Sequence, residues 1–139
     1  MTHETTAYNQ SFGSERLPSH RSWLAAKMIY ILERPATPHQ LHEMLEVYPV
    51  LIKVVVDIRR GILAGGGEMH ADCEIMLLEQ GSEQDDLWGA NWYPGEQRIE
   101  YESLINIRPR LGNRSMIIQN DEIRGKVAII ARALLGGIQ

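Results

Sequence analysis

The middle of the chain, positions 68–78, alternates polar and apolar residues for most of its length, Glu-Met-His-Ala-Asp-Cys-Glu-Ile-Met-Leu-Leu. Successive side chains of a β-strand point to opposite faces, so a strand here would place all four ionisable side chains of the segment in one row. These side chains are Glu68, His70, Asp72 and Glu74. The pattern therefore predicts a strand with one face on the core and one polar face.

Two later segments alternate in the same way. Residues 87–93 place Trp88, Ala90 and Trp92 on one face, and residues 99–108 place Asn106 and Arg108 opposite a row of isoleucines. Turn-forming residues connect the three segments, at positions 80–85 and at Pro94-Gly95. Consecutive strands with short polar connections predict an antiparallel three-strand meander.

Local signals place further elements on both sides of the meander. Residues 27–33 are short, apolar and partly β-branched, which predicts an N-terminal strand. Thr37, Pro38 and Gln40 form a capping-box helix start. Asn120 is the expected N-cap of a C-terminal helix that Gly136 ends.

The segment 50–64 supports two interpretations. Leu51, Val54, Val55, Ile58 and Ile62 recur at helical spacing, and we expect a helix because this period extends over eleven positions. The β-branched run 54–56 with a turn at Arg60-Gly61 indicates a hairpin instead.

These elements predict an α+β fold. It has an N-terminal strand, two helices, the antiparallel three-strand meander, and a C-terminal helix packed on one sheet face. We expect a mobile polar tail over residues 1–18 and a single α+β domain over residues 19–139.

Composition excludes several classes of function. A formal charge of −4 argues against a nucleic-acid binder, and no apolar run is long enough to cross a membrane. The single cysteine, Cys73, lies on the apolar side of the alternation and is expected to be a buried thiol rather than a nucleophile. Such cysteine usage suits a reducing compartment, so we expect a cytoplasmic protein.

The polar row suggests one chemistry. Residues i and i+2 of a strand lie about 6.5–7 Å apart, so neighbouring side chains of the row can converge on one ion. Imidazole and carboxylate ligands suit zinc, manganese or iron. His70 and Asp72 are the candidate metal ligands, and with Glu74 they are the candidate catalytic residues of a metal-assisted hydrolase. We favour a solvated face with cross-strand charge pairs, and therefore no cofactor.

Arginines dominate the segment 108–115. The guanidinium forks of Arg108, Arg110 and Arg114, next to Asn113, suit bidentate recognition of an anion. The favoured alternative is that they pair with acidic side chains of the protein itself. The sheet register would add Asn91 and Asn106 to one polar pocket with Arg108 and the acidic row.

Trp88 and Trp92 are expected in the core or at a subunit interface, and the interface alternative predicts a homo-oligomer.

The chain from about Met28 to Leu135 resembles a family of small uncharacterised bacterial proteins, domain-of-unknown-function family 5674. The stretches that carry the resemblance are Gly66–Asp72, Leu78–Ser82, Asp86–Asn91, Ile105–Pro109 and Gly112–Ser115. The resemblance implies a soluble, stand-alone domain and assigns no catalytic residue. Two hypotheses of function follow: a non-catalytic domain that binds a partner or a small anionic ligand, and the metal-assisted hydrolase.

Overall fold

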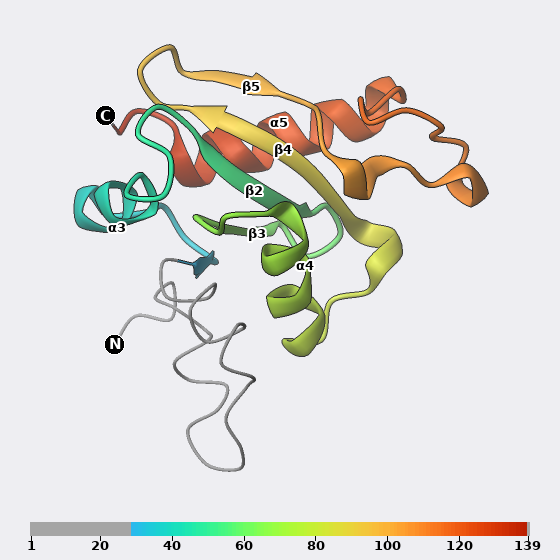
Figure 1. Ribbon diagram of the computed structural model, residues 1–139, viewed down its shortest axis with the longest axis horizontal. Coiled ribbons are helices and arrows are strands. Elements are labelled where there is room, and N and C mark those ends of the chain that lie inside the picture. The colour runs from blue at the N-terminus through green and yellow to red at the C-terminus, as the bar shows by residue number, and fades with distance from the viewer. Residues whose placement is uncertain (1–28, 139) are drawn as a thin grey trace.

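The computed structural model describes residues 29–138, which form one five-stranded antiparallel sheet with helices on both faces (Figure 1). The strands are β1 (Tyr30–Leu32), β2 (Ile52–Asp57), β3 (Ile62–Gly65), β4 (Leu87–Tyr93) and β5 (Arg98–Glu100). The helices are α3 (Pro38–Met44), α4 (His70–Glu79) and α5 (Asp121–Leu135). The strand order is β1-β3-β2-β4-β5 and every pair is antiparallel. The α+β class is confirmed, although this part of the chain contains five strands rather than four.

Two apolar cores lie on opposite faces of the sheet. On one face, Val54, Val56 and the two tryptophans of β4 pack with residues of α5. On the other face, Val55 packs with residues of α4 such as Leu77. Figure 1 shows α4 and α5 on opposite sides of the sheet. A strand that is buried on both faces needs apolar side chains at successive positions, which explains the run 54–56.

The segment 50–64 is a hairpin, so the predicted helix is wrong and the alternative is confirmed. The turn follows Asp57, whose buried carboxylate Oδ1 accepts from the backbone N–H groups of Arg59 and Arg60, both at 2.9 Å. Its Oδ2 accepts from the Ser82 hydroxyl at 2.6 Å, which ties the turn to the loop after α4. Gly61 has a φ of 71°, a conformation that favours glycine.

The segment 68–78 is mostly helix α4, so the predicted strand is wrong. The alternation lasts only to Ile75, whereas the buried positions Cys73, Met76 and Leu77 have the i, i+3, i+4 spacing of one helix face. Most residues of α4 are also good helix formers. The helical period breaks up the polar row. His70 and Glu74 share a face, because they are four residues apart, and Asp72 is turned away from them.

The third strand of the predicted meander is much shorter than expected. β5 ends at Glu100, and the rest of the segment 99–108 is a loop with a 3₁₀ turn at Leu104–Asn106. Ile105 packs against the core under α4, whereas Ile107 is exposed. The predicted single face of isoleucines therefore does not exist.

The local predictions for α3, α5 and the tryptophans are confirmed. Thr37 caps α3 in a capping box, and Asn120 caps α5, whose buried residues pack on one sheet face before the helix ends at Gly136. Trp88 and Trp92 are each 1% exposed, which confirms the core interpretation and excludes them as surface residues. No helix in residues 29–138 is long and apolar enough to cross a membrane. The predicted tail, residues 1–18, lies outside the described residues.

Candidate functional site

Two hollows open on the α4 side of the sheet, and Leu104 and Ile105 contribute to both. The Arg108 hollow has a volume of about 320 Å³. Its other lining residues are Glu74, Gln84, Asp85, Ile107, Arg108, Pro109 and Arg110. The His70 pocket has a volume of about 340 Å³. Its other lining residues are Lys53, Met69, His70, Ala71, Asn91, Glu102, Ser103 and Met116.

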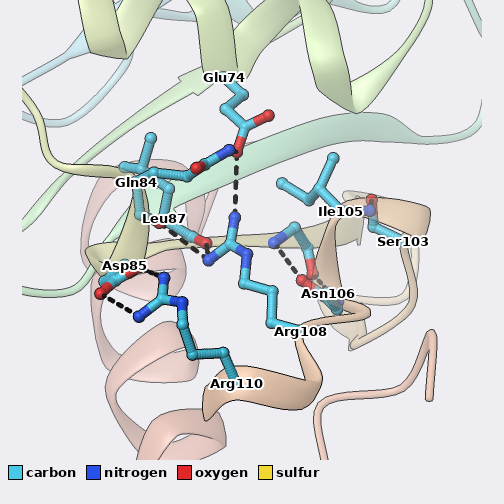
Figure 2. A network of polar contacts seen from close by, with 10 residues as sticks. Glu74, Gln84, Asp85, Leu87, Ser103, Ile105, Asn106, Arg108 and Arg110 are labelled. Atoms are coloured by element: carbon cyan, nitrogen blue, oxygen red, sulfur yellow. Dashed lines mark hydrogen bonds and ion pairs between the residues drawn. The ribbon is translucent and has the colours of Figure 1, made fainter. Parts of the chain in front are cut away.

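Figure 2 shows an ion pair between Arg108 and Glu74, two of the residues that line the Arg108 hollow. Arg108 Nη2 lies 3.0 Å from Glu74 Oε2, and the two side chains are only 10% and 12% exposed. Arg108 Nη1 donates to the carbonyl oxygens of Gln84 and Leu87, at 2.9 and 2.5 Å. Burial lowers the pKa of Arg108 from its usual value, and the Glu74 carboxylate opposes that shift. The guanidinium is therefore already engaged by the protein.

The second arginine of the hollow is also paired. Arg110 makes a bidentate contact with Asp85, at 3.1 Å and 2.5 Å, and both side chains are largely exposed. Its guanidinium holds the pKa of the Asp85 carboxyl below the usual range. Arg114, the third candidate, is exposed, and its backbone N–H donates to the Gln119 side chain. The structure therefore does not bring the three arginines together around one anion.

Asn106 substitutes for a neighbouring strand along β4. Its Oδ1 accepts from the Gly89 N–H at 2.8 Å, and its Nδ2 donates to the Gly89 and Met116 carbonyls at 2.9 and 3.1 Å. Ser103 fits closely against the same strand, since a Cβ at Gly89 would lie 2.6 Å from the Ser103 Cβ. The absence of a side chain at Gly89 thus allows the loop to pack on the sheet.

Asn113 organises the end of the same loop. Its Nδ2 donates to the carbonyls of Asn106, Ser115 and Ile117, and its Oδ1 accepts from the Gln119 N–H. Both asparagines are buried, with 0% and 3% exposure. Their amides are satisfied by backbone groups, which is the usual state of buried polar side chains.

His70 has a different environment. The side chain is 8% exposed, and Nε2 lies 2.8 Å from the Ala90 carbonyl oxygen. A carbonyl oxygen only accepts, so Nε2 carries the proton. Burial lowers the pKa of His70, and Lys53 lowers it further, whereas the contacts with the Ala90 carbonyl and the Asn91 side chain oppose that shift. The lowered pKa favours the neutral ring, in which Nδ1 is a hydrogen-bond acceptor.

Asn91 has one satisfied end and one unsatisfied end. Its Nδ2 donates to Glu100 Oε1 at 2.9 Å, and that oxygen also accepts from the Tyr93 hydroxyl at 3.2 Å. Its Oδ1 is buried and has no hydrogen-bond partner among residues 29–138. An unpaired buried acceptor costs about 1–3 kcal/mol, so this atom requires an explanation.

Two charges in the His70 pocket lack counter-ions within the described residues. Lys53 Nζ lies 5.2 Å from the centre of the Tyr48 ring and forms no ion pair there. Glu102 also lines the pocket, and no hydrogen bond or ion pair engages its carboxylate within the described residues either. No pattern in the sequence singled out either residue as a site residue. Lys53 is the one charged residue in the apolar run 50–56. Because this run is a strand, a charge within it indicates a functional position.

The first turn of α4 also borders this pocket. Met69 is the N-cap and makes no side-chain cap, while the Asp72 carboxylate accepts from the Met69 N–H at 3.3 Å. Met69, His70 and Ala71 all line the pocket. The N–H groups of a helix's first turn have no acceptor within the helix, and they attract negative charge.

The structure does not assemble the predicted metal site. His70 is directed at the Ala90 carbonyl, Asp72 at the Met69 N–H, and Glu74 at Arg108. Within residues 29–138 no group of three or more histidine, cysteine or acidic residues is placed to hold a metal ion. The geometry on which the hypothesis depended, a single row along a strand, is wrong. Cys73 is fully buried, and burial raises the pKa of its thiol to about 12.

The fold and the two hollows define an α+β domain with a small, partly buried pocket between a helix start and a sheet. The model of the family described as "Protein of unknown function (DUF5674)" matches residues 30–134. The chain belongs to this family, as the resemblance indicated. No curated protein matches the chain. No solved structure matches it either.

Proposed function

We propose that this domain is a non-catalytic binding module that takes a small ligand with an anionic group into the His70 pocket. The observation that carries the proposal is the incomplete state of that pocket. Lys53 has no counter-ion in the described residues, which an anionic group would supply, and the buried Asn91 Oδ1 has no partner there, so it can accept from a donor elsewhere on the ligand. The arginines of the Arg108 hollow are not available to an anion in this way, because Arg108 is paired with Glu74 and Arg110 with Asp85.

The pocket supplies two kinds of contact for such a ligand. The Lys53 ammonium and the N–H groups of the first turn of α4 attract an anion. Met69, Leu104 and Met116 offer apolar surface to the rest of the ligand. A volume of about 340 Å³ lies at the lower end of small-ligand pockets, so the ligand is small.

Binding of 4-methylpentanoate to the full chain tests this function. We expect saturable changes in the backbone amide NMR signals of His70 and Ala71 and in the side-chain amide signal of Asn91. Lys53→Met should weaken this binding about tenfold, which corresponds to one charge-assisted contact. Arg110→Met, in the other hollow, is the matched control and should not change it.

Three results would overturn the proposal. The first is the absence of saturable binding, and the second is a set of signal changes that maps to the Arg108 hollow. The third is equal binding of the uncharged 4-methylpentanamide, which would show that the anionic group contributes nothing.

We also propose that the domain acts in the cytoplasm, needs no cofactor and does not bind nucleic acid. The formal charge of −4 and the pairing of Arg108 and Arg110 with acidic residues support the last point. The buried tryptophans leave the outer strands of the described sheet, β1 and β5, as the route to self-association. Light scattering of the full chain tests this route: a monomer at all concentrations would exclude it.

A further inference from the structure

We infer that the ligand of the His70 pocket is a zwitterion of the size of one apolar amino acid, with its carboxylate at Lys53 and its ammonium at Glu102 and Asn91 Oδ1. This inference rests on the proposed function and adds the chemical class of the ligand. It follows from the charges of the pocket that lack an ion-pair partner and from the atoms that lack a hydrogen-bond partner within the described residues.

Within the described residues, the pocket is lined by one charge of each sign that has no ion-pair partner. Lys53 and Glu102 both line it, yet they form no ion pair with one another. A purely anionic ligand would satisfy Lys53 and place a second negative charge beside Glu102. A purely cationic ligand would leave Lys53 without a partner. Only a ligand with both charges satisfies both side chains.

The unpaired atom of Asn91 is an acceptor, and its neighbour Glu100 fixes that orientation. The amide Nδ2 lies 2.9 Å from Glu100 Oε1. Rotating the amide by 180° would place the Asn91 oxygen against a carboxylate oxygen, and two acceptors cannot share a hydrogen bond. The buried Oδ1 has no hydrogen-bond partner among the described residues, so an ammonium group of the ligand can donate to it.

His70 adds a second acceptor close to Asn91. With Nε2–H donated to Ala90, the neutral ring presents the lone pair of Nδ1. Together, Asn91 Oδ1, the Glu102 carboxylate and His70 Nδ1 are three acceptors in one pocket. An ammonium group has three N–H donors and no acceptor, which matches this set.

The remaining lining residues indicate an apolar side chain on the ligand. Met69, Ala71, Leu104, Ile105 and Met116 line the pocket with apolar atoms. Methionine side chains adapt to ligands of different shape, so the pocket suits a class of apolar amino acids.

Three probes of similar shape separate the contributions of the two charges. L-leucine carries both charges, 4-methylpentanoate lacks the amine, and 3-methylbutylamine lacks the carboxylate. We expect calorimetric titration of the full chain to show L-leucine binding at least tenfold more tightly than either single-charge probe. Equal binding of L-leucine and 4-methylpentanoate would overturn the zwitterion inference and leave the proposed function intact. No binding of any probe would overturn both.

The variant Glu102→Gln provides a second, independent readout. It removes the partner of the ammonium, so L-leucine should bind about tenfold more weakly. It also removes a like charge next to a carboxylate, so 4-methylpentanoate should bind more tightly. Glu122→Gln, on α5 at the other face of the sheet, is the matched control and should change neither affinity. A parallel loss for both probes with Glu102→Gln would contradict the inference.

Discussion

The two hollows on the α4 side share Leu104 and Ile105, yet their polar groups are in opposite states. In the Arg108 hollow, the buried guanidinium has an ion-pair partner and two carbonyl acceptors. In the His70 pocket, a buried acceptor has no hydrogen-bond partner and two charges have no ion-pair partner within residues 29–138. Satisfied buried groups stabilise a fold, whereas unsatisfied ones at a cavity indicate a ligand. The arginine-rich segment therefore lines the hollow whose polar groups stabilise the fold. The candidate binding site is the His70 pocket, whose polar groups lack partners.

Arg108→Met should produce the largest loss of stability in this comparison. It leaves the nearly buried Glu74 carboxylate without its partner, and breaking a buried pair in this way costs about 3–5 kcal/mol. Urea denaturation of the purified variant measures the change. Arg110→Met is the matched control and should cost much less, because its pair with Asp85 is exposed to water.

The double variant Arg108→Met/Glu74→Leu tests the physical reason for that loss. Removing both charges avoids the uncompensated carboxylate, so most of the stability should return. A double variant as unstable as Arg108→Met alone would show that the ion pair is not the cause. The polar groups of the Arg108 hollow would then not be what stabilises the fold at this position.

Asn106→Ala should have the second-largest effect. It leaves the Gly89 N–H and C=O, both within the sheet, without their side-chain partners. Each unsatisfied buried group costs about 1–3 kcal/mol, so we expect a loss of about 2–4 kcal/mol after partial relaxation. Hydrogen exchange should show faster exchange of the Gly89 amide. Unchanged exchange at Gly89 would contradict the view that Asn106 replaces a strand.

The sequence predicted those elements whose signals are local. The caps Thr37 and Asn120 and the strand 87–93 depend on residues that act within one turn or one face, and the structure has all three. The segments 50–64 and 68–78 were assigned to the wrong class. Whether a run such as 54–56 is a doubly buried strand depends on α4 and α5, which cover it from both sides.

The candidate site was predictable only in part, for the same reason. His70 and Asn91 were chosen for their chemistry, and both line the pocket. Lys53 and Glu102 were missed because their approach to His70 depends on tertiary contacts between β2, α4 and the loop after β5. Asn106 and Asn113 were chosen as ligand-binding residues, but no sequence pattern shows that their amides bind backbone groups of their own loop and strand.

The pH dependence of stability should report on His70. Its folded-state pKa is lowered from 6.5, so the unfolded chain takes up a proton on this ring at higher pH than the folded chain. Its contribution is complete above about pH 6.5 and falls as the pH decreases toward the lower folded pKa, with a slope of at most about 1.4 kcal/mol per pH unit. Urea denaturation between pH 7.5 and 5.5 measures this loss. His70→Gln should reduce the slope, and His39→Gln, at an exposed position, should preserve it.

Lys53→Met and Glu102→Gln should have the smallest effects on stability. Neither charge has an ion-pair partner in the described residues, so removing one leaves no buried counter-charge behind. Substitutions of this kind usually change the free energy of unfolding by less than about 0.5 kcal/mol. The same variants are expected to change ligand affinity about tenfold. Arg108→Met should lower stability, and Arg108 does not line the His70 pocket in which the ligand is proposed to bind. If Lys53→Met destabilised the protein as strongly as Arg108→Met, Lys53 would be a structural cation, and the contrast between the two hollows would no longer indicate where a ligand binds.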